Sequence, residues 1–151
     1  MGYLLALALV AADTTGHPGI RQLHGIHSRL RSNRGLAAQT LCPRLCSRAQ
    51  GWADTMAKQG SFRHSGMGVR ENIAMGHRSC GSVMRGWMDS EGHRRNLMSG
   101  GSRVGFGYQR GGNGQVYWVS LHSSGGSNVA APHRTYKPKP SKRRRRFRLF
   151  R

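Results

Sequence analysis

Acidic residues are scarce in this sequence. Asp and Glu total 5 against 25 Lys and Arg, and the formal net charge is +20. Residues 134–151 hold 10 of the basic residues and no acid, while residues 21–125 hold 15 basic and 4 acidic residues, a net of +11. A chain of this charge is attracted to polyanions such as nucleic acid, anionic lipid or anionic wall polymers. An acidic side chain near histidines therefore stands out.

Long apolar runs are also missing. The longest run, residues 1–12, is too short to span a bilayer, which needs about 20 residues, but it suits the core of a secretory signal. Val10 and Ala12 fit a cleavage before Asp13, although no Lys or Arg precedes the run. We expect a signal peptide at 1–12 and a secreted or cell-envelope protein. The alternative is a buried or disordered start.

Several catalytic and binding motifs are absent. The chain has no Walker A motif, no GxGxxG after a strand, no HExxH and no paired CxxC, which argues against NTPases, dinucleotide-binding folds, zincins and zinc ribbons. Ser65 lacks a GxSxG context, which disfavours a serine hydrolase. Cys42 and Cys46 are one helical turn apart, an awkward geometry for a disulfide, and Cys80 could pair with either. The pairing stays open, and three is an odd number, so at least one thiol is free or intermolecular.

The length suits one domain with tails. We expect a compact unit at 21–125, a linker at 13–20 and a disordered basic tail at 126–151, which is too polar to form a core. Apolar spacing predicts helices from Leu23, from Leu41 to Gly60 with Pro43 in the first turn, and from Val83 to near Ser90. Residues 92–101 are interpreted as a turn. Alternation predicts a hairpin of 104–108 and 115–121 joined by a glycine turn.

His64, Glu71 and His93 form the candidate site. Imidazole and carboxylate groups bind divalent cations or move protons near neutral pH. With these three side chains as ligands, water would complete an open site for Zn²⁺ or another divalent ion. The alternative is that hydrogen bonds hold Glu71 and that it binds nothing.

The order of motifs resembles a known family. The segments IHSRLRSNRGL, AQGWADTMAKQGSFRHS, RENIAMG, VMRGWMDSEGHRRNLM, VGFGY and VYWVSLH follow one another over about 100 residues. They are similar to the bacterial form of the CAP superfamily, also called the SCP or cysteine-rich secretory protein domain. The resemblance implies an α+β fold, a three-layer αβα sandwich with a small antiparallel sheet between helices.

The family cleft carries two His and two Glu. The resemblance assigns His64, Glu71 and His93 to three of these positions, whereas Ser90 stands at the fourth. The neighbouring Glu91 could replace the missing carboxylate only if its loop turned inward. A metal is found in some members of the family and not in others, so Zn²⁺ or another divalent cation is the expected cofactor.

Three functions follow from these observations. The first is an exported binding or interaction module for an unknown ligand, with no turnover. The second is a metal-dependent hydrolase of peptide or cell-wall substrate, in which Glu71 is the general base. The third is a basic nucleic-acid-binding protein. In the tail, Arg143, Arg144, Arg145, Arg146 and Arg148 alternate with apolar residues and are candidates for contact with an anionic membrane or wall polymer.

Overall fold

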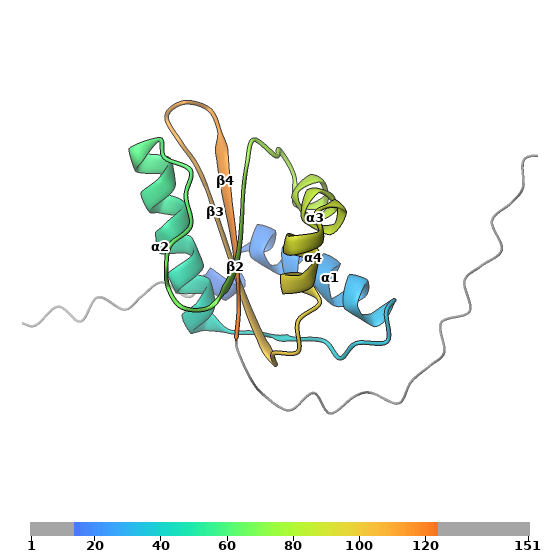
Figure 1. Ribbon diagram of the computed structural model, residues 1–151. Helices are drawn as coiled ribbons and strands as arrows, with labels where there is room; N and C mark the ends of the chain where they lie inside the picture. Colours follow the sequence, from blue (N-terminus) through green and yellow to red (C-terminus); the bar gives the residue numbers. More distant parts are fainter. Residues whose placement is uncertain (1–13, 124–151) are drawn as a thin grey trace, which may run out of the picture.

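A computed structural model describes residues 14–123 of the chain (Figure 1). The expected signal at 1–12, the tail at 126–151 and the five tail arginines lie outside this range. Within it, the elements are η1 (Thr14–Gly16), α1 (Pro18–Ser32), β1 (Thr40–Leu41), α2 (Pro43–Gln59), β2 (Arg70–Met75), α3 (Cys80–Asp89), α4 (Glu91–Leu97), β3 (Arg103–Arg110) and β4 (Val116–His122).

The four strands form one sheet in the order β1-β3-β4-β2. Strand β4 pairs antiparallel with β2 and β3, while the two-residue β1 pairs parallel with β3. Helix α2 covers one face of the sheet, and α1, α3 and α4 cover the other (Figure 1). The predicted α+β sandwich of three layers is therefore confirmed, with a mixed sheet in place of a purely antiparallel one.

Strand β4 is the centre of two hydrophobic cores. All seven of its residues are buried, because it has a strand on each side and helices over both faces. Val116 and Trp118 pack on the side of α1 and α3, while Tyr117, Val119 and Leu121 pack against α2. Side chains of successive strand residues point to opposite faces, which explains this division.

Two glycines of β3 let α2 lie directly on the sheet. A Cβ added at Gly105 would overlap the backbone of Leu45 and Cys46, and one at Gly107 would overlap the backbone of Ala49 and Gln50. Any side chain at either position would separate the helix from the strand.

Local signals explain most helix ends. Helix α2 begins with Pro43 in its first turn, as predicted, and ends at Gly60, whose left-handed conformation (φ 61°) suits glycine. The start of α1 differs from expectation: the helix begins at Pro18, inside the segment predicted as a linker. The His17 side chain caps it by accepting a hydrogen bond from the Gly19 N–H at 3.2 Å.

Two elements were not predicted. Most of the segment 92–101, interpreted as a turn, belongs to helix α4 (Glu91–Leu97), in which only Leu97 is buried. Strand β2 has no polar and apolar alternation, because Asn72, Ile73 and Ala74 are buried one after another. The predicted hairpin is confirmed as β3 and β4.

A buried polar cluster connects α1 to the sheet. We call it the buried histidine cluster: His27, Arg31, Gln39, Ser120 and His122, each at most 1% exposed. His27 Nε2 donates to the Leu97 carbonyl at 2.9 Å, and Arg31 donates to the carbonyls of Ala37, Leu97 and Ser99. His27 and His122 are therefore both fully buried and hydrogen-bonded inside the fold.

The cluster keeps its histidines neutral. Gln39 uses its amide to donate to the Ser99 and Gly101 carbonyls, so its Oε1 accepts from His122 Nδ1 at 3.1 Å. Burial lowers the pKa of His27 to about 4 and holds the pKa of His122 well below its ordinary value, and the nearby Arg31 adds to both shifts. The reason is that a charged imidazole loses its hydration when it is buried.

Candidate functional site

His64 and Glu71 meet at the open edge of the sheet. His64 lies in the loop between α2 and β2, as predicted for a residue after the Gly60 stop, and Glu71 is the second residue of β2. His64 Nδ1 is 2.6 Å from Glu71 Oε1. The Ser65 backbone N–H donates to the same oxygen at 3.0 Å. The loop therefore folds back onto the carboxylate through two adjacent donors.

The Glu71 carboxylate is satisfied on one side only. Its side chain is 6% exposed, against 64% for His64. Oε2 is buried and has no hydrogen-bond partner in the described part of the chain. A buried carboxylate oxygen without a donor is energetically unfavourable. A hydrogen-bond donor or a cation beside this oxygen would satisfy it.

His93, on α4, is held near this pair by two asparagines. The Asn72 side chain donates to the His93 carbonyl at 3.1 Å, and the Asn96 side chain donates to the Glu71 carbonyl at 3.0 Å and to Asn72 Oδ1 at 2.8 Å. These bonds tie α4 to β2. Sequence analysis missed Asn96, because its importance depends on the contact between two elements that were not predicted.

Burial lowers the pKa of His93, and the neighbouring His64 imidazole lowers it further. A lowered pKa favours the neutral imidazole, whose unprotonated nitrogen can accept a hydrogen bond or bind a metal. We refer to His64, Glu71 and His93 together as the histidine–glutamate site.

No second carboxylate joins the site from the neighbouring loop. Ser90 joins α3 to α4 and makes no side-chain hydrogen bond at the start of α4. Glu91 is 77% exposed and pairs with Arg95 at 3.8 Å on the outer face of α4. It therefore does not occupy the fourth position.

The fit of the site to a metal ion is incomplete. Across residues 14–123, no group of three or more His, Cys, Asp or Glu side chains is arranged to hold one. Glu71 Oε2 is the group that an ion would satisfy, whereas His64 Nδ1 is already engaged with Oε1. The donor types suit Zn²⁺, but their present arrangement suits a hydrogen-bonding ligand better.

The remaining tryptophans differ in role. Trp87 is buried in the core and donates to the Ile73 carbonyl at 3.2 Å. Trp52 is partly buried against the core on the α2 side, Arg63 covers its ring at 4.9 Å, and its indole donates to the Arg63 carbonyl. It supports the loop that carries His64.

The fold and these motifs define a class of protein. Residues 24–122 match the CAP, or cysteine-rich secretory protein, family, and the chain belongs to that family. No curated protein sequence gives a significant match.

Solved structures with a similar fold are distant in sequence. An outer surface protein of Borrelia burgdorferi is 18% identical with a TM-score of 0.61, and the match covers 68% of this chain and 89% of that one. An extracellular SCP-domain protein of Bacillus anthracis is 21% identical with a TM-score of 0.57, covering 70% of this chain and 40% of that one. A venom allergen-like protein of Schistosoma mansoni is 12% identical with a TM-score of 0.57, covering 82% and 96%.

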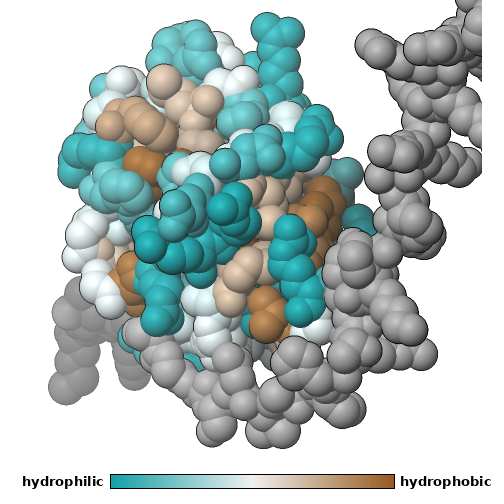
Figure 2. Space-filling model, turned by 45° about the vertical axis from the view of Figure 1, so that its right-hand side comes forward, coloured by the Kyte–Doolittle hydropathy of each residue, from teal (hydrophilic) through white to brown (hydrophobic). Residues whose placement is uncertain are grey.

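None of the helices in residues 14–123 has the length and apolar character that crossing a bilayer requires. The face drawn in Figure 2 is mostly hydrophilic, with small separate hydrophobic patches.

Proposed function

We propose that the protein is a binding module that works after export, at the cell envelope or outside the cell, and that the histidine–glutamate site holds its ligand. Family membership supports this, as do the apolar residues 1–12. Among the structural neighbours, one is described as an outer surface protein and another as extracellular.

The unpartnered Oε2 of Glu71 carries the proposal. The oxygen is buried, while the His64 imidazole beside it is exposed. A purely structural carboxylate would have both oxygens satisfied, as buried polar groups usually are. A small ligand with an ammonium, hydroxyl or amide donor would complete the set of hydrogen bonds. A divalent cation is the second occupant that this chemistry allows.

Catalysis has less support. A metal-assisted hydrolase would use Glu71 as its general base. However, Ser90 stands where a second carboxylate would be, and Glu91 points outward to Arg95. The site thus offers one carboxylate, which is enough to bind a ligand.

Binding of a divalent cation at the histidine–glutamate site is tested by calorimetric titration of the full chain with Zn²⁺. We expect His64→Ala and His93→Ala to weaken the tightest binding by at least about tenfold, as loss of a ligand or its support does. His77→Ala is the matched control, because His77 is half-buried and outside the site. Equal affinity in all three variants would remove the metal from the proposal.

Binding of a ligand with hydrogen-bond donors is tested with glucosamine, which carries an ammonium group and several hydroxyls. The His64 and His93 imidazole resonances are followed by NMR during the titration. We expect them to shift in the wild type and to stay unchanged in Glu71→Gln, which keeps the shape but not the charge. If neither glucosamine nor Zn²⁺ binds in a way that depends on Glu71, the proposed binding role is wrong.

The same variant separates binding from hydrolysis. Peptide or wall-polymer hydrolysis that a chelator inhibits and that Glu71→Gln abolishes would make the protein an enzyme. Hydrolysis that survives Glu71→Gln would come from a contaminant. We expect no turnover in either protein.

A further inference from the structure

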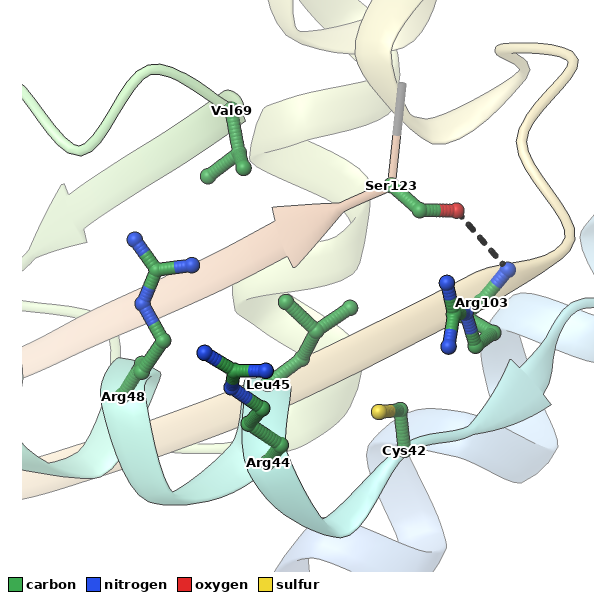
Figure 3. A pocket seen from close by; sticks show the side chains of 7 residues that line it. All are labelled: Cys42, Arg44, Leu45, Arg48, Val69, Arg103 and Ser123. Carbon is green, nitrogen blue, oxygen red and sulfur yellow. Dashed lines mark hydrogen bonds between the residues drawn. The ribbon is translucent and has the colours of Figure 1, made fainter. Parts of the chain in front are cut away.

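A pocket of about 310 Å³ lies on the other side of the sheet from α4. It is formed by the start of α2, the start of β3, the residue before β2 and the residue after β4 (Figure 3). It shares no lining residue with the histidine–glutamate site. Its volume is in the range of pockets that hold small organic ligands.

Three arginines surround this pocket. Arg44 and Arg48 come from α2, and Arg103 comes from β3 (Figure 3). We call it the arginine pocket. Arg48 donates to the Met67 carbonyl at 3.2 Å, which orients its guanidinium. The charges therefore come from two separate elements that meet only in the folded chain.

No acid neutralises these charges in the described part of the chain. Its two ion pairs are His64–Glu71 and Glu91–Arg95, and no Asp or Glu lines the arginine pocket. Arg44 and Arg48 are four residues apart on one helix face, where like charges repel each other. An anion in the pocket would remove this repulsion.

The start of α2 adds a weaker positive potential to that of the three arginines. Cys42 is the residue before the helix, and its side chain caps no backbone N–H. Pro43 has no N–H to offer. The positive end of the helix dipole and the uncapped N–H groups of the first turn favour an anion at this end.

The pocket also has an apolar wall. Leu45 and Val69 line it together with the arginines. A bare inorganic ion would leave this wall without a partner, whereas an organic ester would cover it. Guanidinium groups match the oxygens of a phosphoryl group in pairs, and three of them suit its double charge.

We propose that the arginine pocket binds the phosphoryl group of a phosphate ester, with the organic part of the ester against Leu45 and Val69. The ester comes either from a soluble metabolite or from a lipid headgroup. This site is independent of the proposed function at Glu71, so failure of either one leaves the other in place.

Cys42 provides a reporter for the test. Its thiol lines the pocket and is half-buried, whereas Cys46 and Cys80 are buried in the core. Iodoacetamide should therefore alkylate Cys42 first in the folded full-length chain, and mass spectrometry gives the rate. One set of reactions contains glycerol 3-phosphate or glycerol. A second contains vesicles of phosphatidylcholine with or without phosphatidylglycerol.

We expect a saturating phosphate ester to slow alkylation of Cys42 by at least about fivefold, because only the unoccupied fraction reacts. Protection by glycerol 3-phosphate would identify a soluble ester, and protection by phosphatidylglycerol vesicles alone would identify a lipid headgroup. Either result supports the proposal, whereas no protection by either probe overturns it.

A matched pair of variants separates the pocket from the general positive charge. Arg44→Gln with Arg103→Gln should abolish protection. Arg29→Gln with Arg85→Gln removes the same charge from exposed positions outside the pocket and should leave protection intact. All four arginines are exposed, so both proteins should fold, and their circular dichroism spectra check this. Equal protection in the two variants would mean nonspecific attraction and would overturn the site.

Discussion

The buried histidine cluster and the histidine–glutamate site contain the same kind of side chain in opposite settings. In the cluster, His122 has a partner on each ring nitrogen, from Gln39 and Ser120, and no exposed surface. At the edge of the sheet, His64 is 64% exposed, and its partner Glu71 keeps an unpartnered buried oxygen. The first has no surface that a ligand could reach, whereas the second has an exposed imidazole beside an unsatisfied carboxylate.

The difference shows that the role of a histidine cannot be inferred from its presence in the sequence. Eight histidines occur in the chain, and residue type alone does not separate structural from functional ones. Hydrogen-bond satisfaction alone does not separate them either, because His27 Nδ1 in the cluster and Glu71 Oε2 at the site are both buried without a partner in residues 14–123. Exposure separates the two regions, since His64 is exposed and the cluster is fully buried. The two regions should therefore respond in opposite ways to substitution, with large stability losses in one and large binding losses in the other.

Substitution of His122 should produce the largest effect. His122→Ala leaves a cavity and removes the partner of Gln39 and Ser120, so we expect a loss of about 3 kcal/mol in the free energy of unfolding. His64→Ala should cost less, about 1 kcal/mol, because His64 is exposed and the Ser65 N–H still donates to Glu71 Oε1 when the imidazole is removed. Urea denaturation at pH 7 measures both. Equal losses would erase the distinction between the two regions.

Acid should weaken the folded state through the cluster. His27 has a pKa of about 4 when folded and 6.5 when unfolded. Below pH 6.5 His27 becomes protonated in the unfolded chain but stays neutral in the folded chain. The free energy of unfolding therefore decreases as the pH falls from 6.5 towards 4. The loss is about 3 kcal/mol for this group, and His122, with its pKa also lowered, adds to it. Urea denaturation between pH 7 and pH 4 measures this slope, which His27→Gln should reduce.

Loss of Asn96 should affect both stability and the site. Asn96→Ala leaves the Glu71 carbonyl and Asn72 Oδ1 without their donor, which should destabilise the fold by about 2 kcal/mol. His93 should also lose its fixed position, with broadening of its NMR resonance. Asn33→Ala, at an exposed helix end, is the control and should change neither quantity. If Asn96→Ala lowers stability but leaves the His93 resonance unchanged, the asparagine hydrogen bonds do not position His93.

The smallest effect is expected at Glu91. Its pair with Arg95 is exposed on both sides, and such pairs contribute between 0 and about 1 kcal/mol. Glu91→Gln should therefore leave stability, glucosamine shifts and Zn²⁺ affinity as in the wild type. Weaker binding in this variant would place Glu91 in the site after all.

Elements with strong local signals could be predicted from the sequence, and the others could not. Helix α2 has apolar residues at helical spacing between Pro43 and Gly60, and the hairpin alternates around a glycine turn. Helix α4 has seven residues and one buried side chain, too little for a visible period. Strand β2 shows no alternation of polar and apolar residues, because the polar Asn72 is buried and donates a hydrogen bond to the His93 carbonyl of α4.

The same distinction holds for the sites. The resemblance to the family pointed to His64, Glu71 and His93, but neither their spacing nor their residue types gave the 2.6 Å contact between the first two. The arginine pocket has no local signal at all. Arg103 is separated from Arg44 and Arg48 by about half the described chain, and only the packing of α2 on β3 brings them together.

The glycines of β3 have a consequence for how ligands enter the arginine pocket. Because α2 lies backbone against backbone on Gly105 and Gly107, the helix cannot rise or slide without breaking this contact. The frame that carries Arg44, Arg48 and Arg103 should therefore stay the same if the proposed ligand binds, with only side-chain rotations left to adjust. Free and occupied forms should superimpose in their backbones, which makes the unliganded shape a valid template for rigid docking of candidate esters.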